Sequence, residues 1–116
     1  MRDNPPLDLV PGTLDMLILK TLVLEPLHGY GIGLRIEQIS DGVFKVNAGS
    51  LFPAFRRLER EGLVTSAWKA TENNRRAKYY ALTTSGRVKL RRWTHEWEVQ
   101  TGAIARIMRA ASTGAA

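Results

Sequence analysis

Side chains suited to binding a polyanion lie in two segments of the sequence. The first combines an amide, a hydroxyl and two guanidinium groups, and the second is a basic cluster. Amides, hydroxyls and guanidinium groups form hydrogen bonds with base edges and phosphate oxygens, and lysine binds phosphates. The spacing of these residues therefore predicts nucleic-acid binding. The first segment holds Asn47, Ser50, Arg56 and Arg57, and the second holds Arg75, Arg76 and Lys78.

The residues that enzymatic chemistry needs are scarce. His28 and His95 are the only histidines, and cysteine is absent. Neither histidine has a carboxylate pair at the spacing of a metal site or an acid–base pair. We therefore expect a protein that is not an enzyme and that uses no metal or cofactor. The lack of cysteine, of a signal-peptide pattern and of a long apolar run predicts a cytoplasmic protein that does not enter a membrane.

Positive charge is concentrated in the middle of the chain. The 116 residues include 17 Lys and Arg against 11 Asp and Glu, a formal net charge of +6. Residues 45–92 contain twelve of the basic residues and three of the acidic ones, whereas residues 1–44 contain three basic and six acidic residues. Such a field attracts phosphates and makes affinity depend on salt. The alternative is a charged surface that only keeps the protein soluble.

The pattern of apolar residues predicts two helices before the polar segments. Apolar residues at helical spacing follow Thr13, so we expect a first helix that Thr13 caps and that ends near Leu24. Residues 28–31 (His-Gly-Tyr-Gly) are predicted to form a glycine-rich turn. A second, shorter helix should follow this turn and end near Gly42.

A third helix should carry the first polar segment. Leu51, Phe55 and Leu58 share one face, the arginines lie off that face, and Gly62 should end the helix. Because Pro53 has no amide proton, either Ser50 caps the helix with Pro53 in its first turn, or the helix starts at Asn47 and bends. We favour a tight first turn from Asn47. The arginines could instead form ion pairs within the helix, with Glu59 or Glu61.

A β-hairpin is predicted after the third helix. Residues 63–69 and 78–82 are rich in β-branched and aromatic residues, and the polar residues 71–76 join them. Asn73 and Asn74 tolerate the positive φ that a hairpin turn needs. Arg75 and Arg76 are expected at the tip, where a solvated loop without function is the alternative. Trp68, on the first strand, is expected to pack.

A long fourth helix completes the expected fold. It should run from residue 84 to about Met108, with residues 90, 93, 97, 100, 104 and 107 at heptad a and d positions. So long an apolar stripe needs a partner, and a second copy of the chain is the economical one. The expected interface consists of Leu14, Leu17, Leu90, Trp93, Trp97, Ile104 and Ile107.

The expected order of elements is that of a winged helix-turn-helix, a mainly α fold with a small β-hairpin and here a long C-terminal dimerisation helix. We divide the chain into a flexible arm (1–11), a DNA-binding domain (12–83), the dimerisation helix (84–109) and a disordered tail (110–116). Residues 47–64, the turn at 28–31 and residues 73–83 resemble the PadR family of bacterial transcriptional regulators. The resemblance covers about residues 11–108 and is closest to the small branch with one C-terminal helix.

The resemblance implies a dimeric repressor of a nearby transporter or stress gene that a small effector often releases from double-stranded DNA. Two departures stand out: Phe52 replaces the usual tyrosine, and Asn73-Asn74 replaces glycines. Without the hydroxyl, Phe52 could pack or touch a thymine methyl. By position, the resemblance places at or near DNA the residues Tyr30, Asn47, Gly49, Ser50, Phe52, Pro53, Arg56, Arg57, Arg75, Arg76 and Lys78.

Two questions of function stay open at this point. In some relatives the tryptophan matched by Trp97 faces its mate across a flat pocket for planar hydrophobic compounds, so Trp93 and Trp97 form either an effector pocket or dimer core. A winged helix can also serve only to bind another protein. The basic third helix and hairpin favour DNA over that alternative, and RNA is disfavoured because its A-form major groove is too narrow for a helix.

Overall fold

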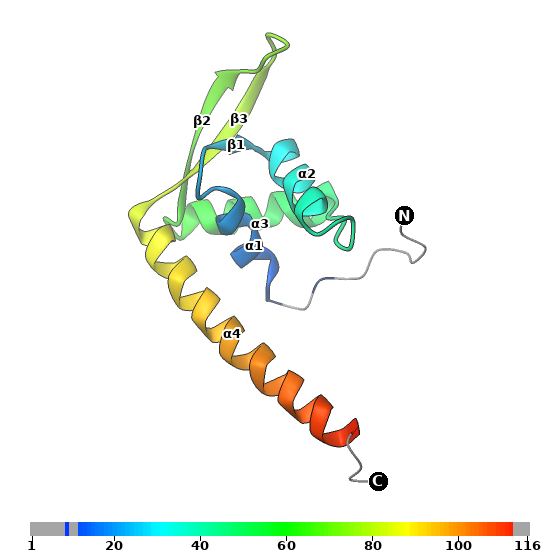
Figure 1. The fold of residues 1–116 in the computed structure, drawn as a ribbon. Helices are drawn as coiled ribbons and strands as arrows, with labels where there is room; N and C mark the ends of the chain where they lie inside the picture. The colour runs from blue at the N-terminus through cyan, green and yellow to red at the C-terminus, as the bar shows by residue number, and fades with distance from the viewer. Residues whose placement is uncertain (1–8, 10–11, 113–116) are drawn as a thin grey trace.

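The computed structural model describes residue 9 and residues 12–112, and the proposed arm at 1–11 lies almost wholly outside them. Three helices form a small bundle, a three-stranded sheet extends from one end of it, and a long helix leaves at the other (Figure 1). This is the predicted winged helix-turn-helix. In chain order the elements are α1 (Leu14–Thr21), β1 (Leu27–His28), α2 (Gly29–Ile39), α3 (Ala48–Arg60), β2 (Val64–Ala70), β3 (Arg76–Leu82) and α4 (Thr84–Ser112).

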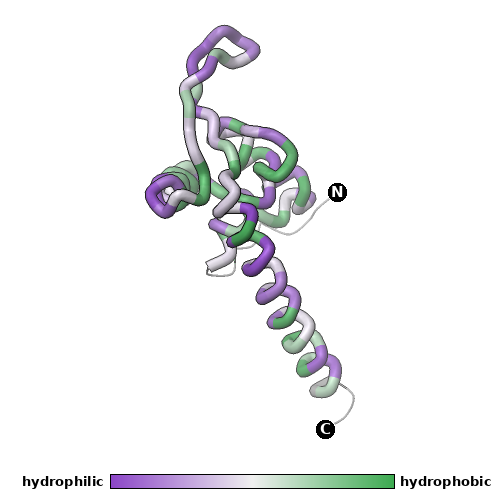
Figure 2. The backbone as a smooth tube through the Cα atoms, turned by 90° about the vertical axis from the view of Figure 1, so that its left-hand side faces the viewer, coloured by the Kyte–Doolittle hydropathy of each residue, from purple (hydrophilic) through white to green (hydrophobic). Residues whose placement is uncertain are grey.

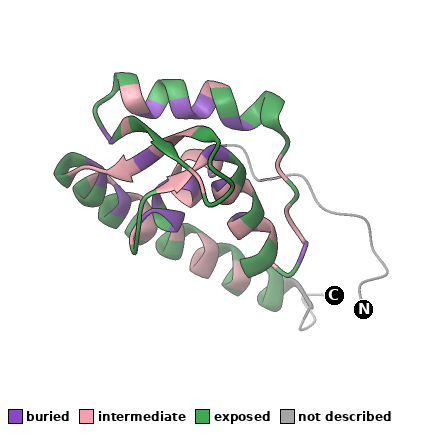
Figure 3. Cartoon of the chain, turned by 90° about the horizontal axis from the view of Figure 1, so that it is seen from above, coloured by how far each residue is buried: buried purple, intermediate pink, exposed green. Residues whose placement is uncertain are grey.

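The core lies where α1, α2 and α3 meet the base of the sheet. The apolar faces of these helices are buried, whereas most of the wing and of α4 is exposed (Figure 3). Phe55 of α3 is at the centre and packs against Tyr80 of β3, with ring centroids 4.6 Å apart and ring planes tilted by 36°. The other largest fully buried side chains are Ile18, Leu19, Leu22, Ile32 and Leu58.

The segment before α2 differs from the prediction. Leu27 and His28 form a short strand that pairs with Tyr80 and Tyr79, so the hairpin becomes a three-stranded sheet in the order β1-β3-β2. The helix then begins inside the predicted turn, because the Nδ1 atom of His28 accepts a hydrogen bond from the Gly31 amide at 3.0 Å. A Cβ at Gly29 would lie 2.9 Å from the Phe55 ring, so the glycine permits close packing of α2 on α3.

The boundaries of α1 and α2 also shift. The first helix ends at Thr21 rather than near Leu24, and the Thr13 side chain forms no capping hydrogen bond. The end of α2 is at Ile39, followed by Asp41 and Gly42 with positive φ. The Gly42 amide donates to the Glu37 carbonyl at 2.7 Å, which closes the last turn.

The third helix confirms the choice made from the sequence. Asn47 is its N-cap, and the side-chain oxygen of Asn47 accepts a hydrogen bond from the Ser50 amide at 3.0 Å. Ser50 is therefore inside the helix, and Pro53 follows in the second turn. At the other end Gly62 has a φ of +75°, and the Leu63 amide donates to the Leu58 carbonyl at 2.9 Å.

The wing is formed by β2 and β3, which pair from Val64↔Leu82 to Ala70↔Arg76. Residues 71–75 form the turn, with Asn74 but not Asn73 at positive φ. Arg76 therefore belongs to the strand, and the tip lies before Arg75 rather than at the two arginines. The expectation that Trp68 packs is wrong: its side chain is 60% exposed.

The fourth helix is longer than predicted and reaches Ser112, so the proposed tail at 110–116 is helical through residue 112, and its remaining residues lie outside the described part. The first turns of α4 rest on α1, and the rest projects away from the bundle (Figures 1 and 2). Its start is tightly packed, because a Cβ at Gly86 would overlap the carbonyl oxygen of Leu63. No helix in the described part of the chain is long and apolar enough to cross a membrane.

Candidate nucleic-acid interface

The exposed face of α3 carries the polar side chains that the sequence singled out. Leu51, Ala54, Phe55 and Leu58 are buried. On the opposite side, Gly49, Arg56 and Arg60 are exposed, with Pro53 half-buried between them. Arg56 forms no hydrogen bond or ion pair with any described residue, so its guanidinium is available to a ligand. Arg60 lies on the same exposed face, although we did not include it among the predicted contacts.

The first turn of α3 also faces solvent. Asn47, Gly49 and Ser50 are exposed. The side-chain oxygen of Asn47 is occupied by the cap, so this residue retains only the amide NH₂ as a free side-chain donor. A Cβ at Gly49 would contact only this oxygen, at 3.2 Å. The turn thus presents a backbone without side-chain bulk at the positive end of the helix dipole, an arrangement that suits a phosphate.

Arg57 lies on one flank of α3 and contacts α1. Its Nη2 atom donates to the Oδ1 atom of Asp15 at 2.8 Å. This hydrogen bond and the charge of Asp15 raise the pKa of Arg57. The partner is therefore an acid from another helix, and neither Glu59 nor Glu61 forms an ion pair with an arginine of α3 in the described residues. The two adjacent arginines thus differ: Arg56 is open and Arg57 is paired.

Glu59 lies on the other flank and holds the wing. Its carboxylate accepts a hydrogen bond from Ser66 Oγ at 2.7 Å and lies 3.4 Å from the Nζ atom of Lys78. The hydrogen bond from Ser66 and the charge of Lys78 lower the pKa of Glu59. Lys78, a predicted DNA contact, therefore also fixes the wing against α3. Sequence reasoning missed this role of Glu59, because its two partners are on different strands.

The wing carries exposed cations in addition to Lys78, which is paired with Glu59. Arg75 and Arg76 are both exposed. The guanidinium of Arg76 lies over the indole of Trp68, 5.9 Å from the ring centroid. On the opposite face of the ribbon, Lys69 lies over Tyr79 at 5.7 Å. The wing therefore has a cation beside an aromatic ring on each face.

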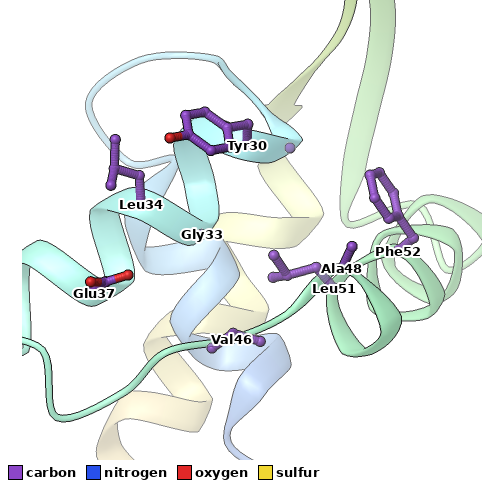
Figure 4. A pocket seen from close by; sticks show the side chains of 9 residues that line it. Tyr30, Gly33, Leu34, Glu37, Val46, Ala48, Leu51 and Phe52 are labelled. Atoms are coloured by element: carbon purple, nitrogen blue, oxygen red, sulfur yellow. The ribbon is translucent and has the colours of Figure 1, made fainter. Parts of the chain in front are cut away.

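Two hollows open beside α3. One, of about 290 Å³, lies between α2 and α3, with Leu51 and Val46 toward its floor and Tyr30, Leu34 and Glu37 around it (Figure 4). The other, of about 430 Å³, lies between α3 and the wing, and its lining includes Phe52, Arg56 and Trp68. Phe52 lines both hollows and meets Phe55 edge to face at 5.6 Å, so it packs as well as facing solvent.

The predicted dimer residues fall into three groups. Leu90 is 7% exposed and belongs to the core of the chain, and the partly buried Leu14 and Leu17 pack against this core. Trp93 and Trp97 are half-buried and line a hollow of about 230 Å³ between α1 and α4. Ile104 and Ile107, farther along α4, are 58% and 66% exposed. The apolar stripe thus begins in the core and ends in solvent.

Three helices followed by a basic wing define a winged helix-turn-helix transcriptional regulator. The chain belongs to the PadR-like family of transcriptional regulators, whose family model matches residues 18–92. The assignment confirms the predicted family and shows a regulator rather than an enzyme.

Similar proteins agree with this assignment. A transcriptional regulator from Clostridium thermocellum is 29% identical over 82% of this chain and 92% of its own, with a TM-score of 0.75. A PadR family transcriptional regulator from Eggerthella lenta is 33% identical over 84% of this chain and 82% of its own, with a TM-score of 0.69. An uncharacterized protein from Lysinibacillus sphaericus is 27% identical over 78% of this chain and 83% of its own.

Proposed function

We propose that this regulator is a cytoplasmic homodimer that binds double-stranded DNA of defined sequence and represses transcription. The observation that carries the proposal is the free cationic face of α3, where Arg56 and Arg60 point away from the core beside a basic wing. A helix of this kind fits the major groove, and the wing then lies along the backbone.

The contacts divide by position on the interface. Asn47, Ser50 and Arg56 are our candidates for reading base edges. Asn47 and Ser50 lie at the N-terminus of α3, and Arg56 has no ion-pair partner among the described residues on its exposed face. Phe52 is the candidate for a thymine methyl. The remaining predicted residues serve the backbone: Tyr30, Gly49, Pro53, Arg57, Arg75, Arg76 and Lys78. Arg57 and Lys78 reach a phosphate only in competition with their carboxylate partners.

Dimerisation is proposed through α4. Ile104 and Ile107 leave a row of apolar side chains in solvent on a helix that extends beyond its own domain. A second copy covers this row and places two recognition helices about 34 Å apart, one turn of DNA. Such a dimer reads a pseudo-palindromic operator.

A planar hydrophobic effector is proposed to release the repressor. The hollow beside Trp93 and Trp97 supports this part of the proposal, because both indoles line it. Indole is large and rigid and favours offset stacking with flat molecules. The same side chains serve as dimer core when no effector is present.

Selection of bound fragments from random duplex DNA, followed by footprinting, tests the proposal. We expect a pseudo-palindromic site with two half-sites one turn apart, and a sedimentation coefficient of a dimer. A single asymmetric half-site would contradict the dimeric mode. A protein that stays monomeric and ignores DNA even in dilute buffer would contradict the whole proposal.

A further inference from the structure

Trp68 is a large aromatic side chain exposed on the wing. It lies on β2 opposite Lys78, and Arg76 is its diagonal neighbour on β3. These three residues therefore share one face of the two-stranded ribbon. The indole is 60% exposed, although burial of such a ring is ordinarily favourable. The Arg76 guanidinium lies over its face, 5.9 Å from the ring centroid.

The hollow between the wing and α3 combines aromatic and cationic walls. Trp68 and Lys78 of the wing line one side, Arg56 of α3 another, and Tyr30 and Phe52 lie at the corner where α2 and α3 approach. None of the lining residues is acidic. Tyr80 is buried and lines the hollow from β3, and desolvation raises the pKa of its hydroxyl, which favours the neutral form.

The chemistry of these walls fits a sugar-phosphate unit. Guanidinium and ammonium groups bind phosphate oxygens, whereas an indole packs on an apolar or flat partner. Because Arg56 belongs both to this hollow and to the exposed face of α3, a ligand in the hollow is continuous with one on α3. We propose that the hollow holds one phosphodiester unit of duplex DNA, with the phosphate toward Arg56 and the deoxyribose against Trp68, while Lys78 stays paired with Glu59.

This inference rests on the proposed DNA binding and adds a contact residue that sequence reasoning assigned to packing. A sugar-phosphate contact is the same at every base pair, so Trp68 contributes affinity without base preference. Glu59 of α3 pairs with Lys78 of β3 and accepts a hydrogen bond from Ser66 of β2. These contacts set the angle between the wing and α3 and therefore the width of the hollow.

The first test uses Trp68 as its own reporter. Trp68, Trp93 and Trp97 are the three tryptophans of the chain, so the difference in emission between the natural chain and Trp68→Phe reports Trp68 while Trp93 and Trp97 stay in place. We expect this difference to change on titration with duplex DNA, with the same midpoint as the anisotropy of a labelled duplex. A fluorescence response to thymidine monophosphate at a concentration similar to that of the duplex would overturn the assignment of the hollow to the DNA backbone.

The second test measures affinity in the otherwise unchanged chain. Trp68→Ala should weaken binding to specific and random duplexes alike, by about tenfold, and Trp68→Phe should retain most of the affinity. Leu24→Ala, an exposed apolar residue (87%) outside α3 and the wing, is the matched control and should have no effect. Thermal unfolding followed by circular dichroism checks that each variant is folded.

The outcomes separate the two proposals. Labelled duplex could bind normally while the emission of Trp68 does not change and Trp68→Phe and Trp68→Ala keep the natural affinity. In that case the hollow does not bind the DNA backbone, and the proposed function stands. If no duplex changes the anisotropy in a titration with the natural chain, the proposed function itself fails. The fluorescence arm needs only the natural chain and Trp68→Phe, so it remains decisive even if Trp68→Ala fails to fold.

Discussion

Arg57 of α3 donates a hydrogen bond to Asp15 of α1 across 2.8 Å, whereas its neighbour Arg56 has no such partner among the described residues. The pair joins the helix proposed to read DNA to the helix on which α4 rests. Among the described residues, Asp15 forms the ion pair with an arginine of α3, whereas Glu59 of α3 pairs with Lys78 of the wing.

Removing the carboxylate of Asp15 should increase DNA affinity. Asp15→Asn frees Arg57 and deletes a negative charge next to the interface, so we expect about 3- to 10-fold tighter binding at low salt and a steeper salt dependence. Stability should fall by less than about 1 kcal/mol, because the pair is partly exposed. Anisotropy at several salt concentrations measures the effect. Glu25→Gln, which breaks the 3.1 Å pair with Arg35 and removes the same charge outside α3, should leave affinity nearly unchanged.

The two adjacent arginines should respond differently to truncation. Arg56→Ala should weaken specific binding by about 10- to 100-fold and relax base preference, since Arg56 is free to reach a base edge. Arg57→Ala should cost only about threefold, because its guanidinium already has a partner in the free protein. Competition between operator and random duplex reports both the affinity and the base preference of each variant. Equal losses for the two variants would refute the distinction.

Acid should loosen the wing. Because Ser66 and Lys78 lower the pKa of Glu59, its contribution to stability is complete above the ordinary glutamate pKa of about 4.3 and is lost as the pH falls through the lower value of the folded state. We expect a contribution of at most about 1 kcal/mol, discounted for exposure. Urea unfolding of the natural chain and of Glu59→Gln from pH 7 to pH 3 tests this. The free energies of unfolding of the two proteins should converge at low pH. A difference that stays constant across the pH range would argue against a stabilising role for the contacts of Glu59 with Ser66 and Lys78.

The exposed end of the α4 stripe should control dimerisation. Ile107→Ala should raise the dimer dissociation constant by about tenfold or more, because it removes apolar area proposed to be buried between subunits. Val99→Ala is the matched control: Val99 lies on the same helix with similar exposure (57%) but off the heptad stripe. Sedimentation equilibrium of both variants gives the constants. Equal dissociation constants for the two variants would contradict dimerisation through the heptad stripe of α4.

The sequence predicted much of this architecture because the decisive signals are local. The apolar face of α3, its cap at Asn47 and its end at Gly62 all follow from residues within one segment. The two-residue strand β1 could not be found in this way, since it exists only through pairing with β3, about fifty residues later. The same holds for the different surroundings of Arg56 and Arg57, which depend on where α1 lies in space.

Trp68 shows the limit of reading a strand from composition. An aromatic residue in a β-rich run was expected to be covered, and the strand was located correctly. The wing, however, extends beyond the bundle that could cover it (Figure 1). Whether one strand position is packed depends on the length of the hairpin relative to α3, which no local pattern records.

Only Thr83 separates β3 from α4, and Gly86 is pressed against the backbone at Leu63, where β2 is about to begin. The base of the wing and the start of α4 are therefore packed closely together at this corner. In a dimer joined along α4, a small change in the crossing angle of the two helices swings the wing tips through a larger arc. In the proposed dimer, the distance between half-sites would depend on the geometry of this corner, and an effector bound in the hollow between α1 and α4 would act on DNA by changing the angle of α4.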